Sequence, residues 1–322
     1  MLLRAVHGQS FVVEIHSDGR PLYNQQPVHG VVTPVVDVAV GHQHYVLLGE
    51  HGELYWCRDR RATFVKTPSP VVSVSCGYQH TTIAFQTGKV RMHNMQIGSR
   101  WVSVRLPGPA VQVYSGNGAS AALLADGTVH TWGRNQSMQL GHTNLRGPAQ
   151  VRLPGRVADF GFGMGFACAL LQDGRLYTWG FGTVPRPRRM NKPTLFSRLA
   201  VGWAYIAAAH MDRSKVSMYG TIGGVRTRNF VQQQPHSVSS LTGGWASTSL
   251  RAEYVMQSPP GPASRQLVSL TEHRWAARRT LVLCVAREQR RRMRKRSRAC
   301  ADGAWSNKLP KELWYEVSRY LG

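Results

Sequence analysis

A dense cationic run in the last part of the 322-residue chain is the clearest candidate for binding chemistry. Guanidinium and ammonium groups at high density suit nucleic-acid phosphates, an anionic membrane surface or a nuclear-import receptor. A solvated helix end would carry the same charges, so the run indicates an anionic partner without naming its class. The residues concerned are Arg290, Arg291, Arg292, Arg294, Lys295, Arg296 and Arg298.

A second candidate is a short amphipathic segment over residues 309–321. Proline suits the first turn of a helix, an acidic residue favours its positive end, and apolar residues four positions apart form one stripe. An aromatic group of the kind found in interface cores lies beside the stripe. A helix this short needs a surface to cover its apolar face, either a partner or the preceding domain. The residues concerned are Leu309, Pro310, Glu312, Leu313, Trp314, Val317 and Leu321.

Patterns that would indicate catalysis or cofactor binding are weak by comparison. The glycines at positions 161, 163 and 165 resemble a phosphate loop but lack the lysine and the following helix that such loops need. No Cys/His set has zinc-finger spacing, and neither a Gly-x-Ser-x-Gly elbow nor a close carboxylate pair is present. The sequence therefore predicts a protein without catalytic residues, a metal site or a cofactor.

The composition limits the kind of protein that positions these segments. The chain is 42% hydrophobic with a formal net charge of +24, and no uninterrupted apolar run is long enough to span a membrane. Its first residues lack the apolar core of a signal peptide, and its five cysteines form no CxxC pair. These features predict a protein of the cytoplasm, the nucleus or both, not a secreted one, with no transmembrane segment.

Turn-forming residues divide the chain into two parts. Residues 1–262 hold 30 Gly and 16 Pro, whereas residues 263–302 hold none. Glycine and proline punctuate short strands and tight turns, and their absence permits a long helix. We therefore predict an all-β domain over residues 1–273, a basic helix over 274–300 and a short helical segment over 301–322.

The first part of the chain is built from a repeat. In each copy a glycine follows a β-branched run, and a second glycine comes eleven residues later in the clearer copies. The first glycines lie at positions 8, 41, 77, 116, 163, 202 and 243. Each copy has room for three or four short strands, and a repeat of this length made only of strands indicates a radial propeller. Seven copies without a long gap predict one closed ring of seven blades.

The repeat carries a family resemblance. The clearest copy, from Asp126 to Gly141, reads Asp-Gly-Thr-Val-His-Thr-Trp-Gly-Arg-Asn-Gln-Ser-Met-Gln-Leu-Gly. This pattern resembles the regulator of chromosome condensation repeat, and His44 and His80 occupy the histidine position of that repeat. The resemblance covers residues 1–270 and implies a seven-bladed β-propeller. It also implies a rigid face that binds a protein target, or a surface for chromatin and nucleic acid.

The segment at residues 309–321 carries a second resemblance. Its Leu-Pro-x-Glu-Leu start and its spaced apolar residues are similar to the first helix of the F-box, which binds the Skp adaptor of cullin ubiquitin ligases. The match covers 13 residues, and the other helices of the motif do not follow. A cut-short F-box behind a repeat domain resembles proteins of large DNA viruses. The resemblance implies that the apolar stripe contacts a Skp-type adaptor.

These features predict a non-enzymatic interaction protein. In this hypothesis the propeller binds a protein target, and the F-box-like helix recruits a Skp-type adaptor of a cullin ubiquitin ligase. The alternative is a chromatin- or nucleic-acid-binding propeller protein with a basic tail, of a large DNA virus. The identity of the target and the face of the propeller that binds it stay open at the level of sequence.

Overall fold

The computed structural model describes most of the first 254 residues, and its regular elements there are all β-strands. The described ranges are 2–7, 11–95, 100–182, 184–190, 193–212, 215–222, 225–233, 238–242 and 251–254. Side chains are described for Val6 and, within these ranges, from Phe11 to Gly220. The fold class predicted for this part of the chain, all-β, is confirmed. No helix that could cross a membrane occurs among the described residues.

Six four-stranded antiparallel sheets follow one another along the chain, and we call them blades 1 to 6. Blade 1 contains β1 (Leu2–His7), β2 (Val12–His16), β3 (Pro21–Tyr23) and β4 (Gln26–Pro27). Blade 2 contains β5 (Val35–Val40), β6 (Tyr45–Gly49), β7 (Leu54–Arg58) and β8 (Arg61–Val65). Blade 3 contains β9 (Val71–Cys76), β10 (His80–Phe85), β11 (Val90–Asn94) and β12 (Trp101–Val104).

Blades 4 to 6 repeat the same plan. Blade 4 contains β13 (Ala110–Ser115), β14 (Ala119–Leu124), β15 (Val129–Gly133) and β16 (Ala149–Gln150). Blade 5 contains β17 (Val157–Phe162), β18 (Phe166–Leu171), β19 (Leu176–Gly180) and β20 (Val184–Arg189). Blade 6 contains β21 (Phe196–Val201), β22 (Tyr205–His210), β23 (Lys215–Ile222) and β24 (Val225–Gln233). A two-stranded sheet of β25 (Val238–Thr242) and β26 (Arg251–Tyr254) follows.

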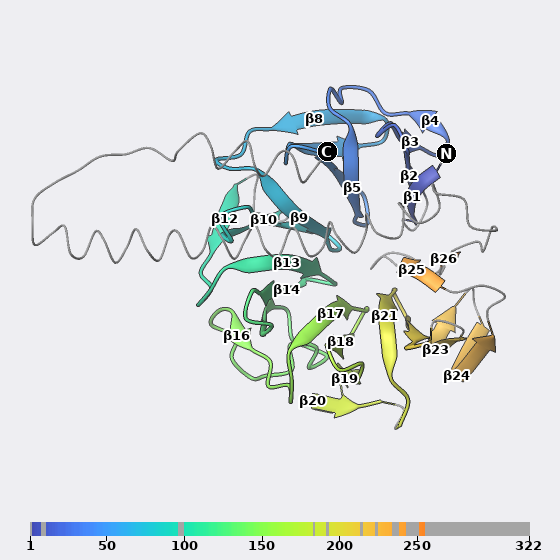
Figure 1. Cartoon of the computed structure of the whole chain (residues 1–322). Helices are drawn as coiled ribbons and strands as arrows, with labels where there is room; N and C mark the ends of the chain where they lie inside the picture. Colours follow the sequence, from blue (N-terminus) through green and yellow to red (C-terminus); the bar gives the residue numbers. More distant parts are fainter. Residues whose placement is uncertain are drawn as a thin grey trace, which may run out of the picture.

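The blades are arranged as a propeller around a common centre (Figure 1). The first strands β5, β9, β13, β17 and β21 lie nearest to the centre, and each contacts the first strand of the next blade. β25 in turn contacts β21, and its position before Gly243 matches the predicted seventh copy of the repeat. A ring of seven blades stays a prediction, because the remainder of that copy lies outside the described residues.

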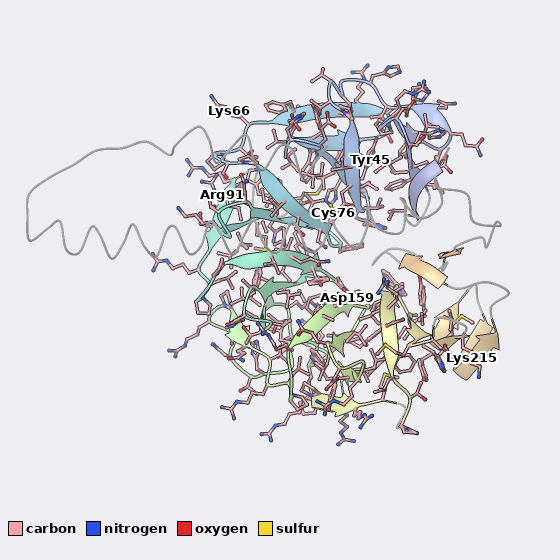
Figure 2. All side chains as sticks on the ribbon, viewed as in Figure 1. Tyr45, Lys66, Cys76, Arg91, Asp159 and Lys215 are labelled. Carbon is pink, nitrogen blue, oxygen red and sulfur yellow. The ribbon has the colours of Figure 1, made fainter. Side chains whose placement is uncertain are left out.

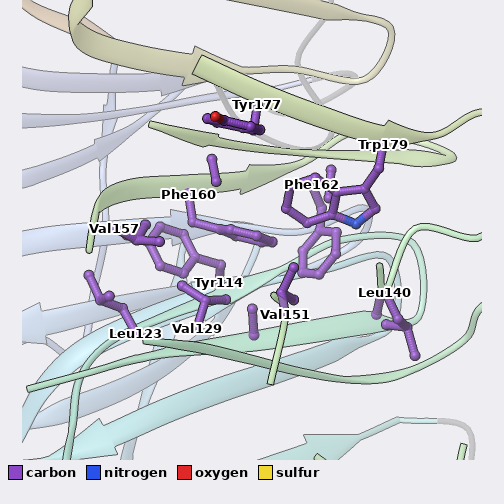
Figure 3. Close-up of a cluster of buried hydrophobic side chains, with 14 of the residues drawn as sticks. Tyr114, Leu123, Val129, Leu140, Val151, Val157, Phe160, Phe162, Tyr177 and Trp179 are labelled. Atoms are coloured by element: carbon purple, nitrogen blue, oxygen red, sulfur yellow. The ribbon is translucent and has the colours of Figure 1, made fainter. Parts of the chain in front are cut away.

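Most of the described hydrophobic core lies between neighbouring blades. The second strands of blades 2 to 5 are buried at every position, so their side chains do not alternate between buried and exposed. Figure 3 shows the cluster shared by blades 4 and 5, in which Leu123 and Val129 of one blade pack with Phe160 and Trp179 of the other. Corresponding clusters join blades 1 and 2, 2 and 3, 3 and 4, and 5 and 6.

The first repeated glycine lies where the first strand of a blade turns into the second. In the described copies its N–H donates to the carbonyl of the residue three positions later, as from Gly77 to His80 at 2.8 Å. A Cβ on Gly77 would lie 2.3 Å from the His80 ring and from the carbonyl oxygen of Gly116, so only glycine fits. The same bond recurs at Gly41, Gly116, Gly163 and Gly202, which confirms the predicted register there.

The second repeated glycine ties each blade to the next. Gly52 has a φ of +88° in the turn between β6 and β7, and its carbonyl accepts the N–H of Val71, the first residue of β9, at 2.9 Å. A Cβ there would lie 2.6 Å from the Cβ of Pro70, so both the backbone and the space exclude a side chain. Equivalent bonds join Gly19 to Val35, Gly88 to Ala110, Gly127 to Val157 and Gly174 to Phe196.

Candidate protein-binding face

The antiparallel order of the strands sorts the connections of each blade onto two faces. The turn after the first strand and the loop after the third strand emerge on one face, which we call the turn face. The turn after the second strand and the linker to the next blade emerge on the other, which we call the linker face. Loops on a rigid scaffold are where binding residues are commonly found in proteins.

The residues directly after the first repeated glycines form the tips of the turn face. Adjacent tips contact each other: the His42 ring stacks on Tyr78 with centroids 4.5 Å apart, and the N–H of Met164 donates to the carbonyl of Trp203 at 2.8 Å. Because these tips end the strands nearest to the centre, they lie around the centre of the propeller on that face. The five described tips are His42, Tyr78, Asn117, Met164 and Trp203.

The longest described loop of the turn face, residues 134–148 between β15 and β16, is fixed in place by blade 5. Trp179 is fully buried under it, and its indole N–H donates to the carbonyl of Gln139 at 2.9 Å. The side chain of Asn135 closes the loop, because its Oδ1 accepts the N–H of Leu140 and its Nδ2 donates to the carbonyl of His142, both at 2.9 Å. The loop therefore presents its outer residues on an ordered backbone.

Three exposed apolar side chains, Met138, Met164 and Phe181, lie on neighbouring segments of the turn face, and we call them the apolar patch. They are 39%, 49% and 57% exposed, respectively. Backbone bonds hold their three segments together: the N–H of Phe181 donates to the carbonyl of Gly165 at 2.7 Å, and the N–H of Gly182 donates to that of Ser137 at 2.9 Å. The patch thus joins the blade 4 loop, a blade 5 tip and the turn between β19 and β20.

The backbone of the apolar patch is strained. Met138 and Phe181 have φ values of 61° and 58°, and they are two of the five non-glycine residues with positive φ in the described part of the chain. Left-handed backbone costs a residue with a side chain about 1–2 kcal/mol, and this region favours glycine or asparagine over bulky apolar residues. The Phe181 ring lies flat on the buried Phe166, with centroids 4.6 Å apart. Strain that holds large apolar groups in the solvent indicates a binding surface.

The buried histidines of blades 2 and 3 connect neighbouring blades. Burial lowers the pKa values of His44 and His80 to about 4, and their Nε2 atoms hydrogen-bond Thr81 and Ser120 of the following blades at 2.8 and 2.9 Å. Asp159 lies on the inner strand β17 (Figure 2), and burial raises its pKa to about 6. No cluster of three metal-binding side chains occurs in the described part of the chain.

The binding residues predicted from sequence all lie outside the described residues. This applies to the cationic run at 290–298 and to the amphipathic segment at 309–321, so the structure does not place either of them. The sequence analysis in turn missed the apolar patch. A signal for it exists, because Trp132-Gly133 is followed by Arg-Asn whereas Trp179-Gly180 is followed by Phe-Gly.

The sequence comparison with protein families finds one kind of repeat in this chain. Residues 110–139 and 126–170 match models described as the Regulator of chromosome condensation (RCC1) repeat. These stretches cover blade 4 and the first half of blade 5, including Met138 and Met164. A search of curated proteins by sequence found no match.

The comparison of structures finds propellers of the RCC1 kind. Prp20p from Saccharomyces cerevisiae, whose binding to Gsp1p and histones has been studied, has a TM-score of 0.66 at 15% identity, over 84% of this chain and 86% of that one. Human WBSCR16 has a TM-score of 0.65 at 16% identity, over 76% and 84%. The yeast protein bound to Kap60 has a TM-score of 0.58 at 16% identity, over 73% and 71%. These likenesses establish the propeller fold.

Proposed function

We propose that the chain is a non-enzymatic protein-binding propeller and that the apolar patch on the turn face is its contact surface. The observation that carries the proposal is the combination of exposed Met138, Met164 and Phe181 with left-handed backbone at two of them. Surfaces of this kind bury apolar side chains of a partner, and methionine adapts to different shapes. The similar yeast propeller binds Gsp1p, histones and Kap60, which supports a role in protein or chromatin binding.

The proposal predicts that the double change Met164→Ser, Phe181→Ser removes partner capture by the purified chain. Loss of two apolar contacts at the centre of an interface costs about 2 kcal/mol or more, which corresponds to a roughly 30-fold weaker affinity. Quantitative affinity capture followed by mass spectrometry measures this loss. Val102→Ser is the matched control, because Val102 is 59% exposed on the outer strand of blade 3. If the double variant and the Val102→Ser control capture partners equally well, the apolar patch is not the contact surface.

The amphipathic segment at residues 309–321 supports a finer proposal, in which it recruits a Skp-type adaptor to the bound target. We expect the double change Leu313→Ala, Val317→Ala to abolish adaptor capture and to leave the melting temperature of the propeller unchanged. If the segment instead packs on its own propeller, the same change lowers the melting temperature and no adaptor is captured by the wild-type chain. Melting and capture measured on one variant therefore separate the two readings.

The cationic run at residues 290–298 supports the alternative, a chromatin- or nucleic-acid-binding propeller. Phosphate contacts give affinity that falls steeply with salt and depends little on base sequence. Oligonucleotide binding that survives in the patch variant and disappears when the seven cations are neutralised would favour this alternative over the protein-binding role.

A further inference from the structure

We infer that the partner of the apolar patch is an acidic protein segment that carries a bulky apolar side chain, an inference that rests on the proposed protein-binding function. The apolar side chain would cover Met138, Met164 and Phe181. The carboxylates beside it would meet the cations that flank the patch. Three observations on the described residues lead to this chemistry.

The first observation is that the two faces differ in charge. Carboxylates in the turns after the second strands all belong to the linker face. On the turn face the described side chains include a single carboxylate, Asp59, in the turn between β7 and β8, and it is flanked by Arg58 and Arg60. The linker-face carboxylates are Asp18, Glu50, Glu53, Asp126, Asp173 and Asp212.

The second observation is that carboxylates of the linker face have cationic partners of their own. Asp173 pairs with Arg175 at 2.6 Å, and hydrogen bonds from Arg175 hold the pKa of that carboxyl below its usual value. Asp18 pairs with Arg20 in the same way, and the backbone N–H of Arg20 contributes most to the lowered pKa of Asp18. The negative charge of the linker-face carboxylates is therefore partly neutralised by neighbouring arginines. The cations of the turn face have fewer carboxylates near them, so a partner that approaches this face meets positive charge.

The third observation is that two exposed arginines lie on the segments that carry Met138 and follow Phe181. Arg134 begins the blade 4 loop that carries Met138, and its guanidinium donates to the neutral side chain of Gln136. In blade 5, Val184 pairs with Gly180, the residue before Phe181, and the exposed Arg186 follows two positions later on β20. A segment lying across the patch would place acidic residues against both guanidinium groups.

The apolar side chains of the patch, rather than its charge, favour a protein segment over a nucleic acid, because guanidinium groups bind phosphates as well as carboxylates. Guanidinium groups form charge-assisted hydrogen bonds with carboxylates, and complementary charge sets the orientation of a bound segment. Bases require aromatic rings with open faces. The patch instead offers two thioether side chains and one ring, Phe181, whose inner face is covered by Phe166. Thioethers pack on aliphatic and aromatic side chains.

The test is a titration of the whole chain with short fluorescent peptides. The reference peptide is a run of Glu and Asp with one central Phe; one matched peptide has Gln and Asn in place of the acids, and another has Ala in place of Phe. A labelled oligothymidine is the nucleic-acid probe. The reference peptide should bind, and either matched peptide should bind at least about tenfold more weakly. Rising salt should weaken the reference peptide, since its carboxylates contact exposed cations.

Two pairs of variants locate the peptide. The changes Met164→Ser, Phe181→Ser and Arg134→Glu, Arg186→Glu should each weaken the reference peptide at least about tenfold. The controls Val102→Ser and Lys66→Glu should leave it unchanged, because Lys66 lies on the linker between blades 2 and 3, at the outer edge in Figure 2.

The outcomes separate the inference from the proposed function. If the amide peptide binds as tightly as the acidic one and the arginine variant has no effect, the acidic partner is wrong although the patch still binds protein. Oligothymidine binding that depends on Phe181 would also overturn the inference, in favour of a nucleic acid. If no peptide depends on the patch but partner capture does, only the inference fails; if neither depends on it, both fail.

Discussion

Replacing Trp179 with alanine is expected to lower the free energy of unfolding by about 3–5 kcal/mol, the range for removing a large buried aromatic side chain. The side chain is fully buried, and it packs in the cluster that blades 4 and 5 share, with its ring centroid 5.8 Å from that of Phe160. The alanine variant also loses the hydrogen bond from the indole N–H to the carbonyl of Gln139. Chemical denaturation of the purified chain measures the change.

The variant Trp179→Phe is the matched control, because it keeps an aromatic ring between the blades but removes the indole N–H. We expect it to cost less than the alanine variant. Both variants should weaken binding at the apolar patch even where the chain remains folded, since Met138 lies next to Gln139 in the loop that rests on this ring. A destabilisation by Trp179→Ala no larger than by Trp179→Phe would mean that blades 4 and 5 close over the lost ring.

The stability of the chain should fall as the pH drops from about 6.5 to about 4. In this range the histidines bind protons in the unfolded chain, whereas the same side chains stay neutral when they are buried in the folded chain. Burial lowers the pKa values of His44 and His80 to about 4 from the ordinary value of 6.5, so the stability that each contributes is present above pH 6.5 and is lost on acidification. Linkage sets the slope at up to about 1.4 kcal/mol per pH unit for each group. The pKa values of the buried His130 and the partly buried His210 are lowered by burial too, so they act in the same direction.

Asp159 opposes the histidines over the same range. Burial raises its pKa to about 6 against hydrogen bonds from Phe160 and Tyr114 and the nearby charge of Arg198. A carboxyl with a raised pKa contributes stability that is complete below its unfolded pKa of 3.8 and is lost as the pH rises through 6. Removing it should therefore steepen the loss of stability in acid.

Two variants test these signs by denaturation between pH 4 and pH 6.5. His80→Gln should flatten the slope by up to about 1.4 kcal/mol per pH unit, and Asp159→Asn should steepen it by a similar amount. Glutamine can hydrogen-bond Ser120 in place of the imidazole, and asparagine can accept from Tyr114 in place of the carboxylate. Identical slopes in the wild type and both variants would show that His80 and Asp159 titrate normally in the folded chain.

Local pattern was enough to predict the blades. The spacing from Gly41 to Gly52 and from Gly77 to Gly88 separates two positions that each form a backbone hydrogen bond and have room only for glycine. The two positions are therefore visible in the sequence as repeated glycines. The connection of one blade to the next was not visible in the same way. The partner of Gly52 is the amide of Val71, which any residue except proline could supply.

The apolar patch could not be predicted from the same pattern, because its parts are far apart in the chain. Met138 and Phe181 are 43 positions apart in the sequence, and the bond from the N–H of Gly182 to the carbonyl of Ser137 joins their segments. Methionine and phenylalanine are usually core residues, so their exposure depends on backbone angles that composition does not reveal. The departure from the repeat after Gly180 marked one of the three residues, but not its neighbours.

The bond from each second glycine to the next blade has a consequence for the order in which the chain becomes stable during synthesis. The carbonyl of Gly52 has no hydrogen-bond donor from blade 3 until Val71 has been synthesised. In the same way, the apolar side of blade 2 is covered only after blade 3 has folded against it. The most recently formed blade of a nascent chain thus has one apolar side exposed to solvent. The next blade covers that side and leaves an apolar side of its own exposed. In arrays of this kind stability belongs to the junctions between units, so local opening of the finished protein would separate two neighbours rather than unravel one.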